Sequence, residues 1–169
     1  MKDVENLQGL FEQGLKYTYD CEQQLIKALP KMAQASSTSQ LQRAFEQHLQ
    51  ETQGHAKLLE QVFQDIGVEA DTEKNEVIRN LIKEGEGMIS HLDKSVLLDA
   101  ALIAAGNQVE HYEMALYGTL RTWAALLGRT KSAKLLDETL TEEKAADQKL
   151  TQIGETSVNR EALNVHAHA

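Results

Sequence analysis

The decapeptide Gln108-Val-Glu-His-Tyr-Glu-Met-Ala-Leu-Tyr117 continues a mostly apolar run that starts at Val96 and has helical periodicity. Steps of three or four residues along that helix place these side chains on one face: Asp99, Leu102, Ile103, Gly106, Glu110, Glu113, Tyr117 and Leu120. Asp99 belongs to the first turns, where an acid suits the helix dipole and water is near. Glu110 and Glu113 lie mid-helix in a stripe that should be dry, where an unpartnered carboxylate costs several kcal/mol. The stretch therefore predicts a helix whose buried acids are compensated by a metal cation.

Composition predicts an all-α protein with a single domain. The chain has 169 residues, of which 41% are hydrophobic and 25% charged, as is usual for a globular domain with a sizeable core. Pro30 is the single proline, aromatic residues make up only 5%, and the helix formers Ala, Leu, Gln, Glu and Lys dominate. No strand-like alternation bounded by turn residues stands out in the sequence.

Charge and cysteine usage narrow the classes of function. The 26 acidic and 17 basic residues give a formal net charge of -9, which argues against a nucleic-acid partner because phosphate binding needs a basic face. Cys21 is the single cysteine, so no intrachain disulfide forms and a reducing compartment fits. The sequence shows no signal segment and no apolar run of membrane-spanning length. We expect a soluble cytoplasmic protein.

Apolar periodicity divides the chain into four long helices. Their predicted bounds are residues 4–35, residues 39–66, a cap at Asp93 or Ser95 through to 127, and residues 130–153. A polar connection after Gly67 and a short amphipathic helix over 77–89, interrupted by two glycines, form a long crossover between the second and third. This arrangement is typical of a ferritin-like four-helix bundle, in which the second and third helices run parallel.

The bundle is predicted to occupy residues 1–154. The tail over 155–169 loses periodicity, and we expect it to be loose. His166 and His168 lie in this tail, where histidines are more often bystanders than ligands.

Each long helix carries acids in the middle of its apolar stripe. The candidate metal ligands are Glu22, Glu51, His55, Glu110, Glu113, Glu143 and Asp147, with His48 and Tyr19 as outer partners or alternative ligands. Residues four apart on a helix rise by about 6 Å and face the same cavity. Two divalent ions balance four carboxylates, which favours Glu22, Glu51, Glu143 and one of Glu110 or Glu113. Oxygen ligands with one or two imidazoles suit two iron or manganese ions better than zinc.

Single residues keep alternative interpretations. His48 is a ligand or a hydrogen-bond partner of a buried acid, and His55 is a ligand or an outer partner. Tyr19, Tyr112 and Tyr117 are expected to be core residues whose hydroxyls contact acids. Cys21 is expected to be a small buried hydrophobic residue.

Three motifs resemble the YciF-type family of ferritin-like proteins. They are Glu51-Thr-x-Gly-His55, Val109-Glu-His-Tyr-Glu-x-Ala-Leu-Tyr-Gly-Thr-Leu120 and Glu142-Glu-Lys-Ala-Ala-Asp147, in a match that covers residues 5–154. The resemblance implies a rubrerythrin-like bundle with a di-iron centre, a homodimer and a link to bacterial stress responses. It also implies metal roles for Glu22, Glu51, Glu110, Glu113 and Glu143.

One departure from the general di-iron pattern leaves the ligand set open. Such bundles use Glu-x-x-His on two helices. Here the choice lies between His48-x-x-Glu51 and Glu51-x-x-x-His55, and Asp147 stands where a second histidine is expected.

Three hypotheses follow from these residues. The leading one is a di-metal oxidoreductase of peroxidase or ferroxidase type that reduces peroxide or dioxygen during stress. The second is metal binding or iron storage without turnover, and the third is a metal-free structural stress adaptor.

Overall fold

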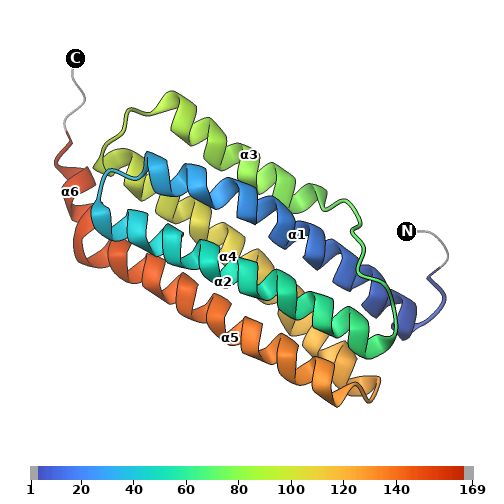
Figure 1. Cartoon of the computed structure of the whole chain (residues 1–169). Helices are drawn as coiled ribbons and strands as arrows, with labels where there is room; N and C mark the ends of the chain where they lie inside the picture. Colours follow the sequence, from blue (N-terminus) through green and yellow to red (C-terminus); the bar gives the residue numbers. More distant parts are fainter. Residues whose placement is uncertain (1–3, 166–169) are drawn as a thin grey trace.

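The computed structural model describes residues 4–165, which are helical with no strand among them. The elements are α1 (Leu7–Ala35), α2 (Ser39–Ile66), α3 (Glu76–His91), α4 (Val96–Leu126), α5 (Thr130–Ile153), the π-helical turn η1 (Gly154–Val158) and α6 (Asn159–Leu163). Helices α1, α2, α4 and α5 form the four-helix bundle, and α3 lies outside it against α1 and α4 (Figure 1). The predicted all-α, ferritin-like bundle is confirmed. No helix within the described part of the chain is long and apolar enough to cross a membrane.

The crossover makes α2 and α4 parallel, as predicted, because α3 carries the chain back along the bundle (Figure 1). The buried Asn75 fixes the start of α3, since its side chain accepts hydrogen bonds from the Ile78 backbone N–H at 3.2 Å and the Tyr112 hydroxyl at 2.9 Å. The second half of α3 stays helical through Gly85, which was expected to interrupt it. Gly85 is buried, and a Cβ there would lie 3.9 Å from Ala105 of α4, so the glycine packs against α4 within the continuous helix.

The helix termini follow the capping signals with one exception. Ser95 caps α4 by accepting from the Leu98 backbone N–H, and Gly67 ends α2 with a left-handed φ of 75°. Helix α1 begins at Leu7 rather than at Val4, because the Asn6 side chain caps it there. The Thr38 side chain at the start of α2 makes no capping bond.

Asp99 supplies that cap instead, which corrects its expected place near water. It is fully buried, and its two oxygens accept hydrogen bonds from the backbone N–H groups of Ser37 at 2.7 Å and Thr38 at 2.9 Å. The carboxylate of α4 therefore satisfies donors at the beginning of α2, where the helix dipole also favours a negative charge.

Replacing Asp99 by Ala should lower the free energy of unfolding by about 3 kcal/mol, because charged hydrogen bonds are lost and two N–H groups stay unpaired. Asp93→Ala is the matched control, since Asp93 is exposed near the start of the same helix. Urea unfolding of both variants measures the difference. An equal, small loss in the two variants would contradict the capping role.

The core consists of two apolar clusters, one toward each end of the bundle. Leu25, Phe45 and Leu102 belong to the cluster near the α1–α2 turn, and Phe11 and Phe63 belong to the other. Between them lies a buried layer of acidic and imidazole side chains. The fold therefore places the polar residues of all four bundle helices at one level.

The tail expected to be loose from residue 155 is instead helical as far as Leu163. Val158 is buried in the same apolar cluster as Ile153 and Ile103, so burial of this side chain extends the helix beyond Gly154. His166 and His168 lie outside the described residues.

Candidate metal centre

The buried polar layer collects six side chains of the kinds that can bind a metal ion, and they come from all four bundle helices. They are Glu22 of α1, His48 and His55 of α2, Glu110 and Glu113 of α4, and Glu143 of α5. Each is at most 5% exposed. The layer thus holds four carboxylates and two imidazoles that are almost entirely shielded from bulk water.

These side chains form two groups. Within each group, the atoms that could bind a metal all lie within 4.8 Å of one another. The first is His48, Glu110, Glu113 and Glu143, and the second is Glu22, His55 and Glu143. Glu143 belongs to both groups. Either group has the residue types and spacing that could hold a metal ion.

His55 links the second group to an outer carboxylate. Its Nδ1 lies 3.0 Å from Glu143 and 3.9 Å from Glu22, while its Nε2 lies 2.7 Å from Glu142 Oε2. Burial lowers the pKa of His55, but the Glu143, Glu22 and Glu142 carboxylates outweigh it and raise the pKa to about 9. A carboxylate on the far nitrogen of a ligating histidine fixes its orientation, and Glu142 has that place here.

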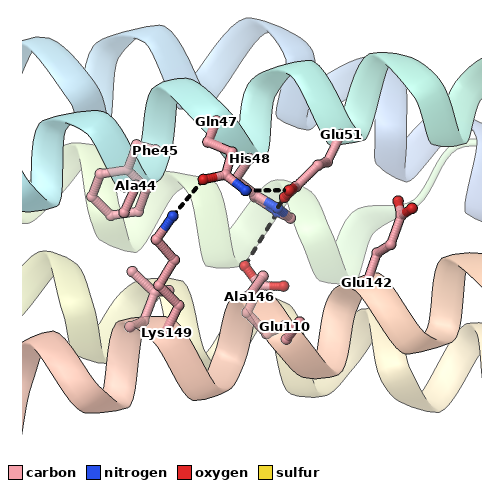
Figure 2. A pocket seen from close by; sticks show the side chains of 11 residues that line it. Ala44, Phe45, Gln47, His48, Glu51, Glu110, Glu142, Ala146 and Lys149 are labelled. Carbon is pink, nitrogen blue, oxygen red and sulfur yellow. Dashed lines mark hydrogen bonds and ion pairs between the residues drawn. The ribbon is translucent and has the colours of Figure 1, made fainter.

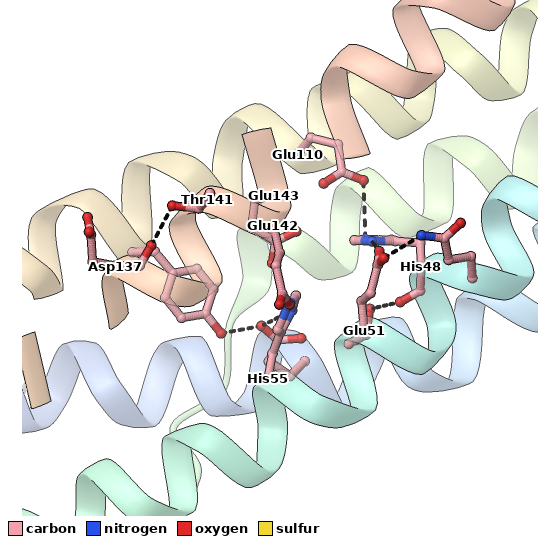
Figure 3. A network of polar contacts seen from close by, with 12 residues as sticks. His48, Glu51, His55, Glu110, Asp137, Thr141, Glu142 and Glu143 are labelled. Atoms are coloured by element: carbon pink, nitrogen blue, oxygen red, sulfur yellow. Dashed lines mark hydrogen bonds and ion pairs between the residues drawn. The ribbon is translucent and has the colours of Figure 1, made fainter. Parts of the chain in front are cut away.

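His48 occupies an equivalent position in the first group (Figure 3). Its Nε2 lies 3.2 Å from Glu110 Oε1, and its Nδ1 lies 3.5 Å from Glu51 Oε2. The pKa of the Glu51 carboxyl is lowered beside His48. Each histidine of α2 therefore has one nitrogen on the buried layer and the other on a more exposed carboxylate.

Burial and mutual repulsion perturb the acids of the layer. The pKa of Glu22 rises to about 8, first because of desolvation and then because of the Glu143 charge. Desolvation also raises the pKa values of Glu110 and Glu113 well above the ordinary range, with Glu143 again the first charge that contributes. The layer thus holds more negative charge than its own donors compensate, so a cation would be stabilised there.

Many oxygens and nitrogens in this layer lack a hydrogen-bond partner among the described residues. They are Glu22 Oε2, Glu110 Oε2, Glu113 Oε2, both oxygens of Glu143, both ring nitrogens of His48, and His55 Nδ1. Buried polar atoms are nearly always paired, so a cluster of unpaired acceptors indicates a missing partner. A metal ion bound by these atoms satisfies them together, and the donor set fits one.

Three of the predicted site residues lie outside both groups. Glu51 is 29% exposed and contacts the outer nitrogen of His48. In the His48-x-x-Glu51 pair, His48 faces the core and Glu51 lies nearer the surface. Asp147 contacts His111 at 3.3 Å and adds to the charge that raises the pKa of Glu110. Tyr19 points away, since its hydroxyl donates to Glu60 at 2.8 Å and its ring packs edge-on against Phe63.

Other contacts add to the predicted set. The fully buried Tyr117 donates its hydroxyl to Glu22 Oε1, as expected of a core tyrosine that contacts an acid. Buried Cys21 lies with its Sγ 3.8 Å from Glu113 Oε1. Glu142 was not predicted from the sequence. It could have been, because a histidine that binds a metal usually contacts a carboxylate through its other nitrogen, and Glu142 is the acid next to the candidate ligand Glu143.

Comparison with known proteins places the chain in a family. A family model described as "Domain of unknown function (DUF892)" matches residues 6–163. Protein YciF of Escherichia coli (strain K12) is 43% identical over 163 residues, which cover 96% of this chain and 98% of that protein. The crystal structure of the E. coli stress protein YciF has a TM-score of 0.89 at 43% identity, covering 93% of this chain and 99% of that chain. YcfI from Rhodopseudomonas palustris has a TM-score of 0.85 at 41% identity, covering 89% and 96%. This chain belongs to the YciF-type family, the family of the DUF892 domain.

Proposed function

We propose that the protein binds two metal ions in the buried layer, with the Glu143 carboxylate shared between them. The unpaired carboxylate and imidazole atoms carry this proposal, since they form two groups of possible ligands that have only Glu143 in common. The charges support it as well. Glu22, Glu110, Glu113 and Glu143 supply four negative charges, which two divalent cations balance.

Iron or manganese is the proposed metal. Both groups combine carboxylate oxygens with one imidazole, whereas zinc sites use more histidine or cysteine. Cys21 is the only cysteine of the chain, and its sulfur lies beside Glu113 rather than in either group. The oxygen-rich donor set therefore favours the harder, redox-active ions.

The proposed reaction is the reduction of peroxide or dioxygen. Bound iron would supply one electron per ion to the oxidant. The residues of this chain would hold the centre: Glu142 and Glu51 orient the two imidazoles, and Tyr117 positions the Glu22 carboxylate with its hydroxyl. The E. coli relative is described as a stress protein, and we propose a stress-associated role for this chain too.

Anaerobic titration with ferrous iron tests the proposal. Wild-type protein should bind two equivalents, and peroxide should then produce a ferric absorption band. Glu22→Ala should bind one equivalent, because Glu22 belongs only to the second group, and Glu110→Ala should bind one because it belongs only to the first. Glu138→Ala, an exposed acid of α5, is the control and should bind two. Wild-type protein that binds no iron would overturn the proposal and favour a metal-free adaptor.

The assembly of the chain distinguishes turnover from storage. Storage requires a hollow shell of many copies, whereas a homodimer, which we propose, cannot enclose a mineral core. Native mass measures this directly, and a dodecamer or larger shell would favour storage. The cytoplasmic location also stays a prediction.

A further inference from the structure

A pocket between α2 and α5 leads from the surface to the first group of ligands (Figure 2). Its volume is about 120 Å³, which is room for several water molecules. His48 and Glu110 line its inner part, while Glu51, Glu142 and Lys149 line it nearer the surface. The candidate metal centre is therefore connected to the outside on this side of the bundle.

Small side chains keep the pocket open. Ala145 and Ala146 of α5 and Ala44 of α2 line it where the two helices face one another. Elsewhere along these helices, large side chains such as Leu136 and Leu59 are fully buried in one apolar cluster. A larger residue at Ala146 would occupy the space in front of His48 (Figure 2).

Unpaired polar atoms lie at the inner end. His48 is 5% exposed and Glu110 is 2% exposed, yet both ring nitrogens of His48 and Oε2 of Glu110 have no hydrogen-bond partner in the described part of the chain. Both residues line the pocket and belong to the first ligand group. A cation inside the pocket would meet atoms that make no hydrogen bond with the residues that the structure describes, although His48 Nε2 and Nδ1 lie 3.2 Å from Glu110 and 3.5 Å from Glu51.

The charges near the surface have opposite effects on a cation. Glu51 and Glu142 present carboxylates on the outer nitrogens of His48 and His55, so each lies one imidazole away from the centre. Lys149 of α5 donates to the Gln47 side chain of α2, which holds its ammonium group across the opening (Figure 2). The carboxylates attract a cation, and the ammonium group repels it.

We propose that this pocket is the port through which divalent cations reach the metal centre, with Glu51 and Glu142 as the first carboxylates they meet and Lys149 as a brake on their passage. The proposal rests on the metal binding proposed above and adds its route. Buried ligands need such a path, because the layer is closed off by the two apolar clusters toward the ends of the bundle.

Stopped-flow measurement of Co²⁺ uptake by the metal-free protein tests the port. Ala146→Phe should slow uptake by about tenfold, a barrier increase of about 1.4 kcal/mol, with the final stoichiometry unchanged. Gln148→Phe is the matched control, because Gln148 is exposed on the same helix outside the pocket, and it should keep the wild-type rate. Lys149→Met keeps the apolar stem but removes the charge, and should accelerate uptake by about threefold at low salt and less at high salt.

Rate and endpoint separate the two proposals. Two Co²⁺ bound at the end with equal rates in wild type, Ala146→Phe and Lys149→Met would overturn the port and leave the metal centre intact. Wild-type protein that binds no Co²⁺ and no Fe²⁺ would overturn the metal centre itself. If Ala146→Phe does not fold, Lys149→Met decides: faster uptake that salt suppresses supports the port, and an unchanged rate overturns it.

Discussion

Glu143→Gln is expected to abolish the binding of both ions and, at the same time, to raise the melting temperature of the metal-free protein. Glu143 is the residue shared by the two ligand groups, so its loss removes an oxygen donor from each. Ligands that bind only the folded state stabilise it by about 3 kcal/mol at a hundredfold excess over Kd. The variant should lose this stabilisation for both ions.

The metal-free protein is expected to become more stable on this substitution, because the buried charge of Glu143 lowers its stability when no cation is bound. The side chain is fully buried, and neither oxygen makes a hydrogen bond within the described part of the chain, although Oε1 lies 3.0 Å from His55 Nδ1. Its charge contributes to the raised pKa values of Glu22, Glu110 and Glu113. An amide of the same shape removes the repulsion and keeps an oxygen within reach of His55 Nδ1, which lies 3.0 Å from Glu143 Oε1. His55 also keeps its contact with Glu142. We expect the lost repulsion among the acids to outweigh the lost charge of the His55 contact. A gain of about 1 kcal/mol raises the melting temperature by about 2–4 °C for a chain of this size.

Calorimetry on chelated and metal-loaded samples measures both effects in one series. Glu138→Gln makes the same chemical change at an exposed position of α5, so it should leave both melting temperatures and the stoichiometry at their wild-type values. A Glu143→Gln protein that still gains stability from two equivalents of metal would contradict the shared ligand. A lower melting temperature of its metal-free form would show that Glu143 stabilises the layer without a cation.

The helices and the level of the site were predictable from the sequence because periodicity reports which residues share a face. The stripe of α4 from Asp99 to Leu120 is buried throughout, and Glu110 and Glu113 both face the interior. The bounds of α2 and α5 were also predicted correctly, since Gly67 and Gly128 mark adjacent turns. Periodicity does not predict how each helix is rotated about its own axis relative to its neighbours to within a fraction of a turn.

Glu51 shows the effect of that rotation. His48, Glu51 and His55 share one side of α2, and two of the three reach the buried layer while Glu51 stays at its edge. The count of charges favoured Glu51 as a ligand together with one of Glu110 or Glu113, whereas both Glu110 and Glu113 belong to a group of possible ligands and Glu51 does not. Contacts between helices, such as His55 with Glu142, depend on neighbours that no local pattern specifies.

The tail illustrates a second limit. Gly154 was predicted to end the last helix, as Gly67 ends α2, but its φ of -59° is right-handed and the chain continues through a π-helical turn. Burial of Val158 against Ile153 outweighs the weak helix propensity of glycine. A single apolar residue after a glycine does not predict a continued helix from the sequence alone, because the residues against which Val158 packs are known only from the structure.

The stability of the metal-free protein is expected to fall as the pH rises, whereas the stabilisation by metal is expected to grow. The pKa of Glu22 is about 8 in the folded protein against an ordinary 4.5, so its contribution is fully present below about pH 4.5 and is lost as the pH rises toward 8. His55 acts in the same direction: its pKa is about 9 against an ordinary 6.5, so its contribution is present below about pH 6.5 and lost as the pH rises toward 9.

Between about pH 6.5 and 8 the titration of both groups therefore lowers the free energy of unfolding, each by up to about 1.4 kcal/mol per pH unit. Metal binding has the reverse dependence, since ions bind ionised carboxylates and neutral imidazoles and release their protons. Urea unfolding of chelated and metal-loaded protein across this range should give two curves that diverge with pH. Glu22→Gln should flatten the chelated curve, because the amide does not titrate. A chelated curve that rises with pH would mean that the layer ionises freely without a cation, and the physical reason for metal binding would be lost.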